Sequence, residues 1–274
     1  MATPVPPRSY LFVPGDRPER FAKALASGAD AVVVDLEDAV VPAAKAVARE
    51  AGAALLAGAA EADRIVVRIN DESTPWFEAD LAMLRAGVAR TVMLPKAERT
   101  ATIERVRAAC PGIAVLPLVE SARGVLAAEA LAAAEGVRRL VFGTIDYALD
   151  MDLQGELATT IGLDAAASRI ALASRAAGVQ PPVAGVTVAI DDEAQLQSDM
   201  ARARAHGFAA KLCIHPKQIT PLHALLAPGA DELAWAQRVL EAAERAGGAA
   251  VQLDGRMVDK PVIERARRIV QRAR

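Results

Sequence analysis

Eight short apolar runs recur along the chain, with helix-forming stretches between them. The runs are Tyr10–Val13, Ala31–Leu36, Ile65–Ile69, Thr91–Leu94, Ala114–Val119, Leu140–Phe142, Val183–Ile190 and Ala210–Ile214. Each run is continuous rather than alternating with polar residues, which is typical of parallel strands buried on both faces. Eight strand–helix repeats in one chain of 274 residues predict an α/β protein with a closed (β/α)₈ TIM barrel.

The connecting stretches have helical spacing and helix-end signals. Examples are Pro42–Leu56, Thr100–Cys110 and Ser121–Ala134, which are rich in Ala, Leu, Glu and Arg. The alternative is an open, doubly wound sheet, which requires a glycine-rich phosphate turn after the first strand. The segment VPGDRP at that place has a single glycine, so the closed barrel is favoured.

The repeats predict a barrel catalytic domain over residues 1–247, completed by a helix near Asp231–Arg245. Residues 248–274 form a C-terminal extension that the barrel does not need. The segment Thr144–Gly162 adds extra polar length after the sixth strand, and such length on a barrel's top face is typical of a lid or substrate wall.

Charge and hydropathy exclude several classes of protein. The net charge is −2 without a basic stripe, which argues against nucleic acid as a partner. No apolar run approaches the roughly 20 residues of a membrane-spanning helix, and the start lacks a secretion signal. Cys110 and Cys213 are too few for a disulfide framework. These features predict a cytoplasmic protein without a membrane partner.

Charged side chains cluster where the predicted strands end, which is where barrel enzymes place reactive groups. They are Glu37, Asp38, Arg68, Lys96, Glu120, Asp146, Asp191 and His215. Glu120 and Asp146 follow adjacent strands without Cys or His beside them, a donor set that suits Mg²⁺ better than zinc. The alternative is that Glu120 caps a helix beginning at Ser121 and that Asp146 pairs with a loop arginine.

Arg68 lies inside the apolar run VVRIN, where an unpaired guanidinium carries a large desolvation cost. It either forms a salt bridge with a neighbouring strand's carboxylate or grips a substrate carboxylate through two parallel hydrogen bonds. The second role is favoured because the same mouth carries candidate metal ligands. Glu37 and Asp38 are candidates for capping a helix or holding metal-bound water, and His215 for a structural role or a wall of the site.

Eight sequence blocks follow one another along the chain. They are SYLFVPGDRPERFAKAL, GADAVVVDLEDAV, VVRIN, MLPKAE, LPLVESARG, VFGTIDYALD, AKLCIHPKQI and DGRMVDKPV. In this order they resemble citrate lyase beta subunit-like proteins of the HpcH/HpaI aldolase family. The resemblance implies a (β/α)₈ barrel, usually a homotrimer or a multiple of one, acting on thioesters of coenzyme A or acyl carrier protein. It also implies that the tail 248–274 packs on a neighbouring subunit.

The resemblance further implies a Mg²⁺-dependent lyase, with Mn²⁺ as an alternative ion. The expected reaction cleaves, or in reverse condenses, a citramalyl, malyl or citryl thioester to a 2-keto acid and an acetyl thioester.

Residue by residue, Glu120 of LVES and Asp146 of GTID resemble the metal ligands that also anchor the substrate. Arg68 of VRIN resembles the contact to the keto acid and the enolate. Arg17 of PGDRPERF would face the thioester cofactor, and Asp259 of DGRMVD resembles an acid–base aspartate lent by a neighbouring subunit. Glu37 completes the candidate catalytic set.

Other functions stay open on the sequence alone. One is a malate-synthase-like or thioester-hydrolysing enzyme that uses the same metal site. Another is a catalytically silent barrel that serves as a subunit of a larger lyase complex, and a third is an enzyme of the phosphoenolpyruvate type. The joint presence of Arg68, Glu120 and Asp146 argues against a silent barrel.

Overall fold

The computed structural model describes residues 6–58, 61–245 and 251–273. The chain divides into two compact units, one over Pro6–Leu222 and the other beginning at His223. This division lies earlier in the chain than the expected boundary at residue 247. The predicted helix near Asp231–Arg245 shares a hydrophobic core with the C-terminal helix.

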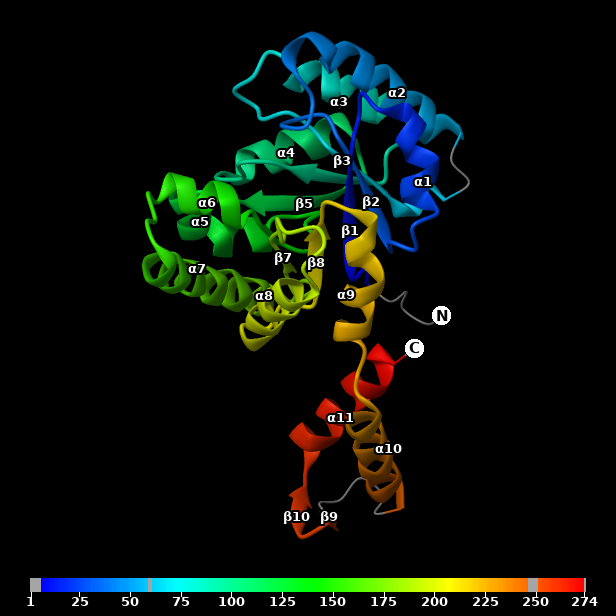
Figure 1. Cartoon of the computed structure of the whole chain (residues 1–274), viewed down its shortest axis with the longest axis vertical. Coiled ribbons are helices and arrows are strands. Elements are labelled where there is room, and N and C mark those ends of the chain that lie inside the picture. Colours follow the sequence, from blue (N-terminus) through cyan, green and yellow to red (C-terminus); the bar gives the residue numbers. More distant parts are fainter. Residues whose placement is uncertain (1–5, 59–60, 246–250, 274) are drawn as a thin grey trace. The chain divides into compact units, whose positions relative to one another are not determined.

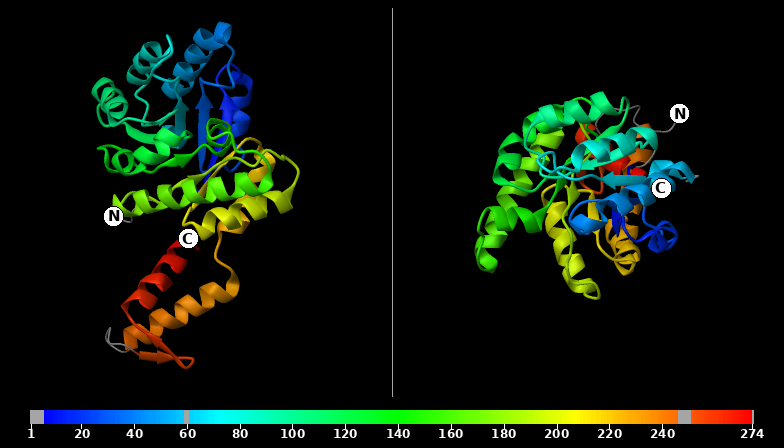
Figure 2. Two further views of the ribbon diagram at one scale, coloured as in Figure 1. Left: turned by 90° about the vertical axis from the view of Figure 1, so that its left-hand side faces the viewer. Right: turned by 90° about the horizontal axis from the view of Figure 1, so that it is seen from above.

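The first unit is a closed barrel of parallel strands, as predicted (Figure 1). Its strands are β1 Ser9–Pro14, β2 Ala31–Asp35, β3 Ile65–Arg68, β4 Thr91–Leu94, β5 Ala114–Val119, β6 Val141–Phe142, β7 Val183–Ala184 and β8 Ala210–Cys213. β8 pairs with β1 and closes the ring, with Lys211 opposite Ser9. The helices of this unit surround the strands (Figure 2). The chain runs around the barrel in sequence order, as the colours from blue to yellow show.

Helices connect successive strands of the barrel. They are η1 Pro18–Arg20, α1 Phe21–Leu25, η2 Pro42–Ala44, α2 Lys45–Gly58, η3 Ala62–Arg64, α3 Phe77–Ala86, α4 Thr100–Ala109, α5 Ala122–Ala133, α6 Thr144–Asp150, α7 Glu156–Ala176 and α8 Glu193–Ala205. After β8 the chain forms η4 Pro216–Gln218 and α9 Ile219–Leu226. Polar caps begin two of the long ones: Ser121 accepts a hydrogen bond from Gly124 N, and Asp192 accepts one from Gln195 N. None of the helices in the described ranges has the length and apolarity to cross a membrane.

One prediction about this part of the barrel was wrong. The segment Thr144–Gly162 contains α6 and the start of α7, and its role as a lid or substrate wall stays a prediction. The expected strand Val183–Ile190 is β7, which ends at Ala184. Val188 is 66% exposed and Ile190 43% exposed, so this part of the apolar run has no neighbouring strand to cover it.

Alternate residues of the strands fill the barrel interior. This core consists of Tyr10, Ala31, Val33, Val66, Met93, Leu116, Leu118, Val141, Val183, Ala210 and Leu212. Side chains alternate along a strand, so the residue two positions beyond an interior one also points inward. Asp35, Arg68 and Glu120 hold such positions beyond Val33, Val66 and Leu118, and this parity aims their charges at the mouth of the barrel.

The second unit has a hydrophobic core of its own. It contains α10 Ala230–Arg245, the antiparallel strands β9 Val251–Leu253 and β10 Arg256–Val258, and α11 Lys260–Arg272. Val239 and Ala236 of α10 pack with Ile263 and Ile269 of α11. The C-terminal extension beyond the barrel therefore has a hydrophobic core that α10 and α11 share.

We expect Val88→Gly to raise the free energy of unfolding by about 0.5–1 kcal/mol. Val88 follows α3 in the left-handed region, with φ 51°, where a β-branched side chain is strained, and its side chain is 77% exposed. The preceding Gly87 is needed for close packing, since a Cβ there would lie 2.9 Å from Leu56 Cδ1. Urea denaturation measures the effect, with Val88→Asn as an intermediate control. A lower free energy of unfolding in Val88→Gly would show that the backbone at Val88 is not strained.

Candidate active site

β2 and β3 bring Asp35 and Arg68 together at the carboxyl end of the barrel, where the two residues are paired in register. Arg68 Nε donates to Asp35 Oδ1 at 2.8 Å, and Nη2 donates to Oδ2 at 2.7 Å. Of the two roles expected for Arg68, the structure shows the salt bridge with a neighbouring strand's carboxylate, which supplies the counter-charge that a buried guanidinium requires. Contact of Arg68 with a substrate carboxylate stays a prediction.

The third nitrogen of Arg68 faces the mouth. Nη1 lies 3.0 Å from Glu37 Oε2 and 3.5 Å from Asp38 Oδ2. The guanidinium also stacks over the Phe12 ring, 4.9 Å from its centroid. Arg68 thus presents one edge to the site, while its other edge is fixed by Asp35.

Glu37 is a buried carboxyl group whose charge is incompletely compensated. Its Oε2 forms no hydrogen bond, since the nearby Arg68 Nη1 lacks the required geometry, and its Oε1 lies 3.8 Å from Lys96 Nζ. Burial raises the pKa of Glu37 to about 7; Arg68 opposes this rise, and the charge of Asp38 adds to it. Glu37 is therefore suited to exchanging a proton near neutral pH.

A buried lysine holds the loop that carries Glu37. Lys45 Nζ donates to the carbonyl oxygens of Leu36 and Glu37, both at 2.7 Å. From the other side, Glu37 N donates to Asp35 Oδ1 at 2.9 Å. Buried hydrogen bonds therefore fix the loop on two sides and orient its carboxyl group.

Glu120 is held by the loop after β4. Lys96 has φ 46°, an uncommon conformation for a residue with a side chain, and its backbone N donates to Glu120 Oε1 at 2.7 Å. Burial raises the pKa of Glu120 to about 8, with smaller contributions from the charges of Glu37 and Asp146. Gly143 makes room for this side chain, because a Cβ there would lie 2.6 Å from Glu120 Oε2. The Glu120 carboxyl group is thus fixed in place and short of positive charge.

Of the other predicted residues of the mouth, one lies near Glu120 and two have partners elsewhere. Asp146, in the first turn of α6, is half-buried and close enough to Glu120 to raise its pKa. Asp191 is exposed and pairs instead with Lys217 Nζ at 2.6 Å. His215 has the structural role that was one of its two alternatives, since its Nδ1 accepts from Lys217 N at 3.2 Å in a capping box.

Arg17 and Asp259 lie outside this cluster of contacts. Arg17 precedes η1, is exposed, and lies 4.0 Å from Asp16 Oδ1. Asp259 begins α11 in the second unit, where its Oδ1 accepts from Val262 N at 3.3 Å. The helix-cap role of Asp259 is therefore confirmed, and its role as an acid–base group stays a prediction.

Carboxyl groups outnumber cationic side chains at the mouth. The acidic mouth, as we define it, consists of Asp35, Glu37, Asp38, Glu120 and Asp146. Its cations are Arg68, Lys96 and Lys45.

The uncompensated carboxyl groups fit a hard divalent cation. Glu37 Oε2 accepts no hydrogen bond, and burial raises the pKa of Glu120, so an added cation would stabilise both charged carboxylates. Within the described ranges, no three Asp, Glu, His or Cys side chains form a complete ligand set. Mg²⁺ typically takes only one or two carboxylates and fills its shell with water and substrate oxygens.

Family models match both parts of the chain. The model for HpcH/HpaI aldolase/citrate lyase matches residues 8–216. The chain belongs to this family. A second model, for carbon–carbon bond lyases of the TIM-barrel fold, matches residues 170–274. The protein is therefore a member of a family of carbon–carbon lyases, and the motif blocks identified it correctly.

Three relatives of this family member cover nearly its whole length. The citrate lyase subunit beta-like protein of Mycobacterium tuberculosis is 39% identical over 96% of this chain and 94% of its own. The (3S)-malyl-CoA thioesterase of Cereibacter sphaeroides is 33% identical over 98% and 95%. The structure of M. tuberculosis protein CitE with magnesium, acetoacetate and coenzyme A has a TM-score of 0.83 at 36% identity, covering 97% of this chain and 98% of that one.

Three supporting residues were missed as members of the site. Lys45 and Gly143 left no signal, since a lysine in a helix and a glycine after a strand are both common. Asp35 was not assigned a role. Strand parity puts Asp35 and Arg68 on the same face, because each lies two residues beyond an interior valine, but pairing them requires the register of β2 and β3.

We expect the metal-free protein of this family to lose stability as the pH rises. The pKa values of Glu37 and Glu120 are raised to about 7 and about 8, from an ordinary 4.5. The folded state therefore binds more protons than the unfolded state between these pH values. The contribution of the two carboxyl groups to the free energy of unfolding is complete below about pH 4.5 and is lost as the pH rises through 7 to 8. Urea denaturation in EDTA from pH 5 to 9 measures it. If the free energy of unfolding of Glu120→Gln depended on pH as that of the parent does, Glu120 would not be a source of this dependence.

Proposed function

We propose that this chain is a Mg²⁺-dependent lyase that cleaves, or in reverse condenses, a short 3-hydroxyacyl thioester of coenzyme A. The products are a 2-keto acid and an acetyl thioester. The observation that carries the proposal is the acidic mouth, in which the buried Glu120 lies near Asp146 and the outward edge of Arg68 faces Glu37. The relative bound to magnesium, acetoacetate and coenzyme A supports the choice of ion and thioester.

Glu120 and Asp146 would hold the ion, with Mn²⁺ as the alternative hard cation. When bound, Mg²⁺ supplies Lewis acidity to the hydroxyl and carboxylate oxygens of the substrate. Lys96 N and Gly143 keep Glu120 in position for this role. Arg17, which is exposed, is our candidate for contact with the phosphates of coenzyme A.

The chain's own groups then manage charge and protons. Glu37, whose pKa is near neutrality, accepts the proton of the substrate hydroxyl group. The carbon–carbon bond breaks, its electron pair moves to the thioester carbonyl, and Arg68 Nη1 stabilises the resulting enolate. Asp259 of a neighbouring subunit protonates the enolate carbon. In the condensing direction each group performs the reverse transfer.

The substrate is best identified with purified protein, Mg²⁺ and a panel of citramalyl-, malyl- and citryl-CoA. Release of a 2-keto acid together with acetyl-CoA is expected for one or more of them. The likeness to a (3S)-malyl-CoA thioesterase makes hydrolysis the second candidate, which releases free malate and coenzyme A from malyl-CoA. No product from any thioester, of coenzyme A or of acyl carrier protein, would favour a silent subunit of a larger complex.

We further propose that the chain assembles as a homotrimer or a multiple of one, and that the tail reaches a neighbouring subunit. A mixture of Asp259→Ala and Glu120→Gln, each inactive alone, is then expected to regain activity when subunits exchange. Some mixed sites would contain both residues intact. Initial rates before and after subunit exchange measure the effect.

Two controls separate this role of Asp259 from helix capping. Asp259→Asn keeps a cap oxygen for Val262 N and should preserve stability while losing activity, because an amide cannot transfer the proton. Full activity of Asp259→Asn would rule out the acid–base role. Lack of recovery in the mixture, with exchange shown by mass spectrometry, would rule out shared sites.

A further inference from the structure

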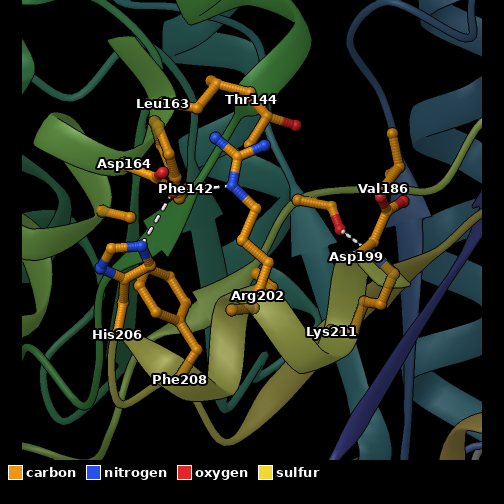
Figure 3. Close-up of a pocket in the computed structure, with 14 residues that line it drawn as sticks. Phe142, Thr144, Leu163, Asp164, Val186, Asp199, Arg202, His206, Phe208 and Lys211 are labelled. Atoms are coloured by element: carbon orange, nitrogen blue, oxygen red, sulfur yellow. Dashed lines mark hydrogen bonds and ion pairs between the residues drawn. The ribbon is translucent and has the colours of Figure 1, made fainter. Parts of the chain in front are cut away.

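A cavity of about 180 Å³ lies behind the barrel strands, away from the acidic mouth. β6, β7 and β8 contribute Phe142, Ala184 and Lys211 to its wall, and α7 and α8 contribute the opposite side (Figure 3). No residue of the acidic mouth lines it. The cavity is therefore separate from the chemistry proposed above.

Lys211 is a buried cation at the wall of this cavity. Its neighbours Ala210 and Leu212 point into the barrel core, so the lysine points outward toward the helices. Its residue is 2% exposed, and Nζ donates to the Gly185 carbonyl oxygen at 2.6 Å. Among the described residues, the Gly185 carbonyl oxygen is the hydrogen-bond acceptor of Lys211 Nζ. No carboxylate of these residues lies within ion-pair distance of Lys211 Nζ. Burial lowers the pKa of Lys211, and Asp199 only opposes this in part.

The other charged side chains of the cavity already have hydrogen-bond partners. Asp164 Oδ1 accepts from Arg202 Nε at 2.7 Å and lies 2.8 Å from His206 Nε2. Asp199 is held on both oxygens, by Thr187 Oγ1 at 2.6 Å and by Gln195 Nε2 at 2.7 Å. Lys211 is thus the cation in this wall whose charge lacks a direct counter-charge.

The residue beside Lys211 leaves space for an anion. Ala184 of β7 is the register partner of Lys211, and both line the cavity. A methyl group therefore stands where a longer side chain could reach the ammonium. The rest of the wall is largely apolar, with Phe142, Leu163 and Phe208 among its residues.

We propose that this cavity binds a small carboxylate with a short apolar tail, whose carboxylate pairs with Lys211 and whose tail packs on the apolar wall. Asp164 and Asp199 line the same cavity and disfavour a dianion such as phosphate. A monoanion of acetate to butyrate size satisfies the free N–H groups and the apolar surface together.

Titration of the full chain in EDTA with acetate, propionate and butyrate tests the proposal, with chloride and inorganic phosphate as comparison anions. Chelator keeps a metal site from binding the same ligands. NMR with ¹³C-labelled carboxylates is expected to show affinity rising with tail length, and about tenfold or more weaker binding in Lys211→Met. Lys217→Met, an exposed lysine, is the matched control and should bind as the parent does.

Ala184→Asp provides an independent variant that does not remove the lysine. Its carboxylate should pair with Lys211, raise the melting temperature of the ligand-free protein above that of Ala184→Asn, and abolish butyrate binding. Butyrate binding unchanged in both Lys211→Met and Ala184→Asp would overturn the proposal. So would tighter binding of phosphate than of butyrate, or no carboxylate binding in the parent.

Discussion

Replacing Glu120 by Gln is expected to abolish Mg²⁺ binding and to lower kcat/KM by at least about 100-fold. The amide has nearly the same shape, but it removes the charge of a buried carboxyl group of the mouth. Its carbonyl oxygen still accepts the hydrogen bond from Lys96 N. In EDTA the variant should therefore be at least as stable as the parent, since an amide needs no compensation for a buried charge.

Isothermal titration with Mg²⁺, alone and with pyruvate or oxaloacetate, measures this effect. Asp146→Asn should behave in the same way, because it removes the second proposed ligand. Glu129→Gln, an exposed residue of α5, is the matched control and should keep both Mg²⁺ binding and stability. If both Glu120→Gln and Asp146→Asn still bound Mg²⁺ or showed Mg²⁺-dependent keto-acid binding, Glu120 and Asp146 would not be the metal ligands.

Arg68→Ala is expected to lower the free energy of unfolding by about 3–5 kcal/mol and to remove activity. Its loss leaves Asp35 without its bidentate partner and Glu37 without its nearest cation. Arg68→Lys should also lose at least about 100-fold in kcat/KM, because a point charge cannot hold Asp35 and reach the mouth at the same time.

Urea denaturation measures the loss of stability, and added Mg²⁺ should restore part of it by supplying positive charge to the mouth. Arg90→Ala is the matched control, because Arg90 forms an exposed pair with Asp63 at 2.7 Å. Such a pair contributes about 0–1 kcal/mol. Equal stability of the Arg68 and Arg90 variants would show that the Asp35 pair does not support the barrel.

The barrel could be predicted from the sequence because strand and helix periods are local properties. Thr91–Leu94 and Ala114–Val119 were predicted with the bounds that the structure has. The end of β7 could not be predicted, because apolarity alone does not tell a covered strand from the exposed Val188 and Ile190. Helix α6 was missed because its polar, acidic sequence resembles that of a loop.

The residue types of the candidate site could also be predicted, but their partners could not. Glu37, Arg68, Glu120 and Asp146 were found because strand ends meet at one face of a barrel. Which charge Arg68 would engage depended on the register of β2 and β3, and that register placed Asp35 opposite it. The sequence favoured a substrate carboxylate as the partner of the Arg68 guanidinium, and the structure adds its pair with Asp35.

The sequence by itself determined the strand–helix repeat, the family and the acidic groups at the strand ends, because each depends on residues that are close along the chain. Only the tertiary structure decided which carboxyl groups are desolvated, that Lys45 and Gly143 support them, and that Lys211 faces a cavity. It also decided that α10 joins α11 in a unit beginning after Leu222. Desolvation and pairing are set by strand register and packing between distant segments, and no local pattern encodes them.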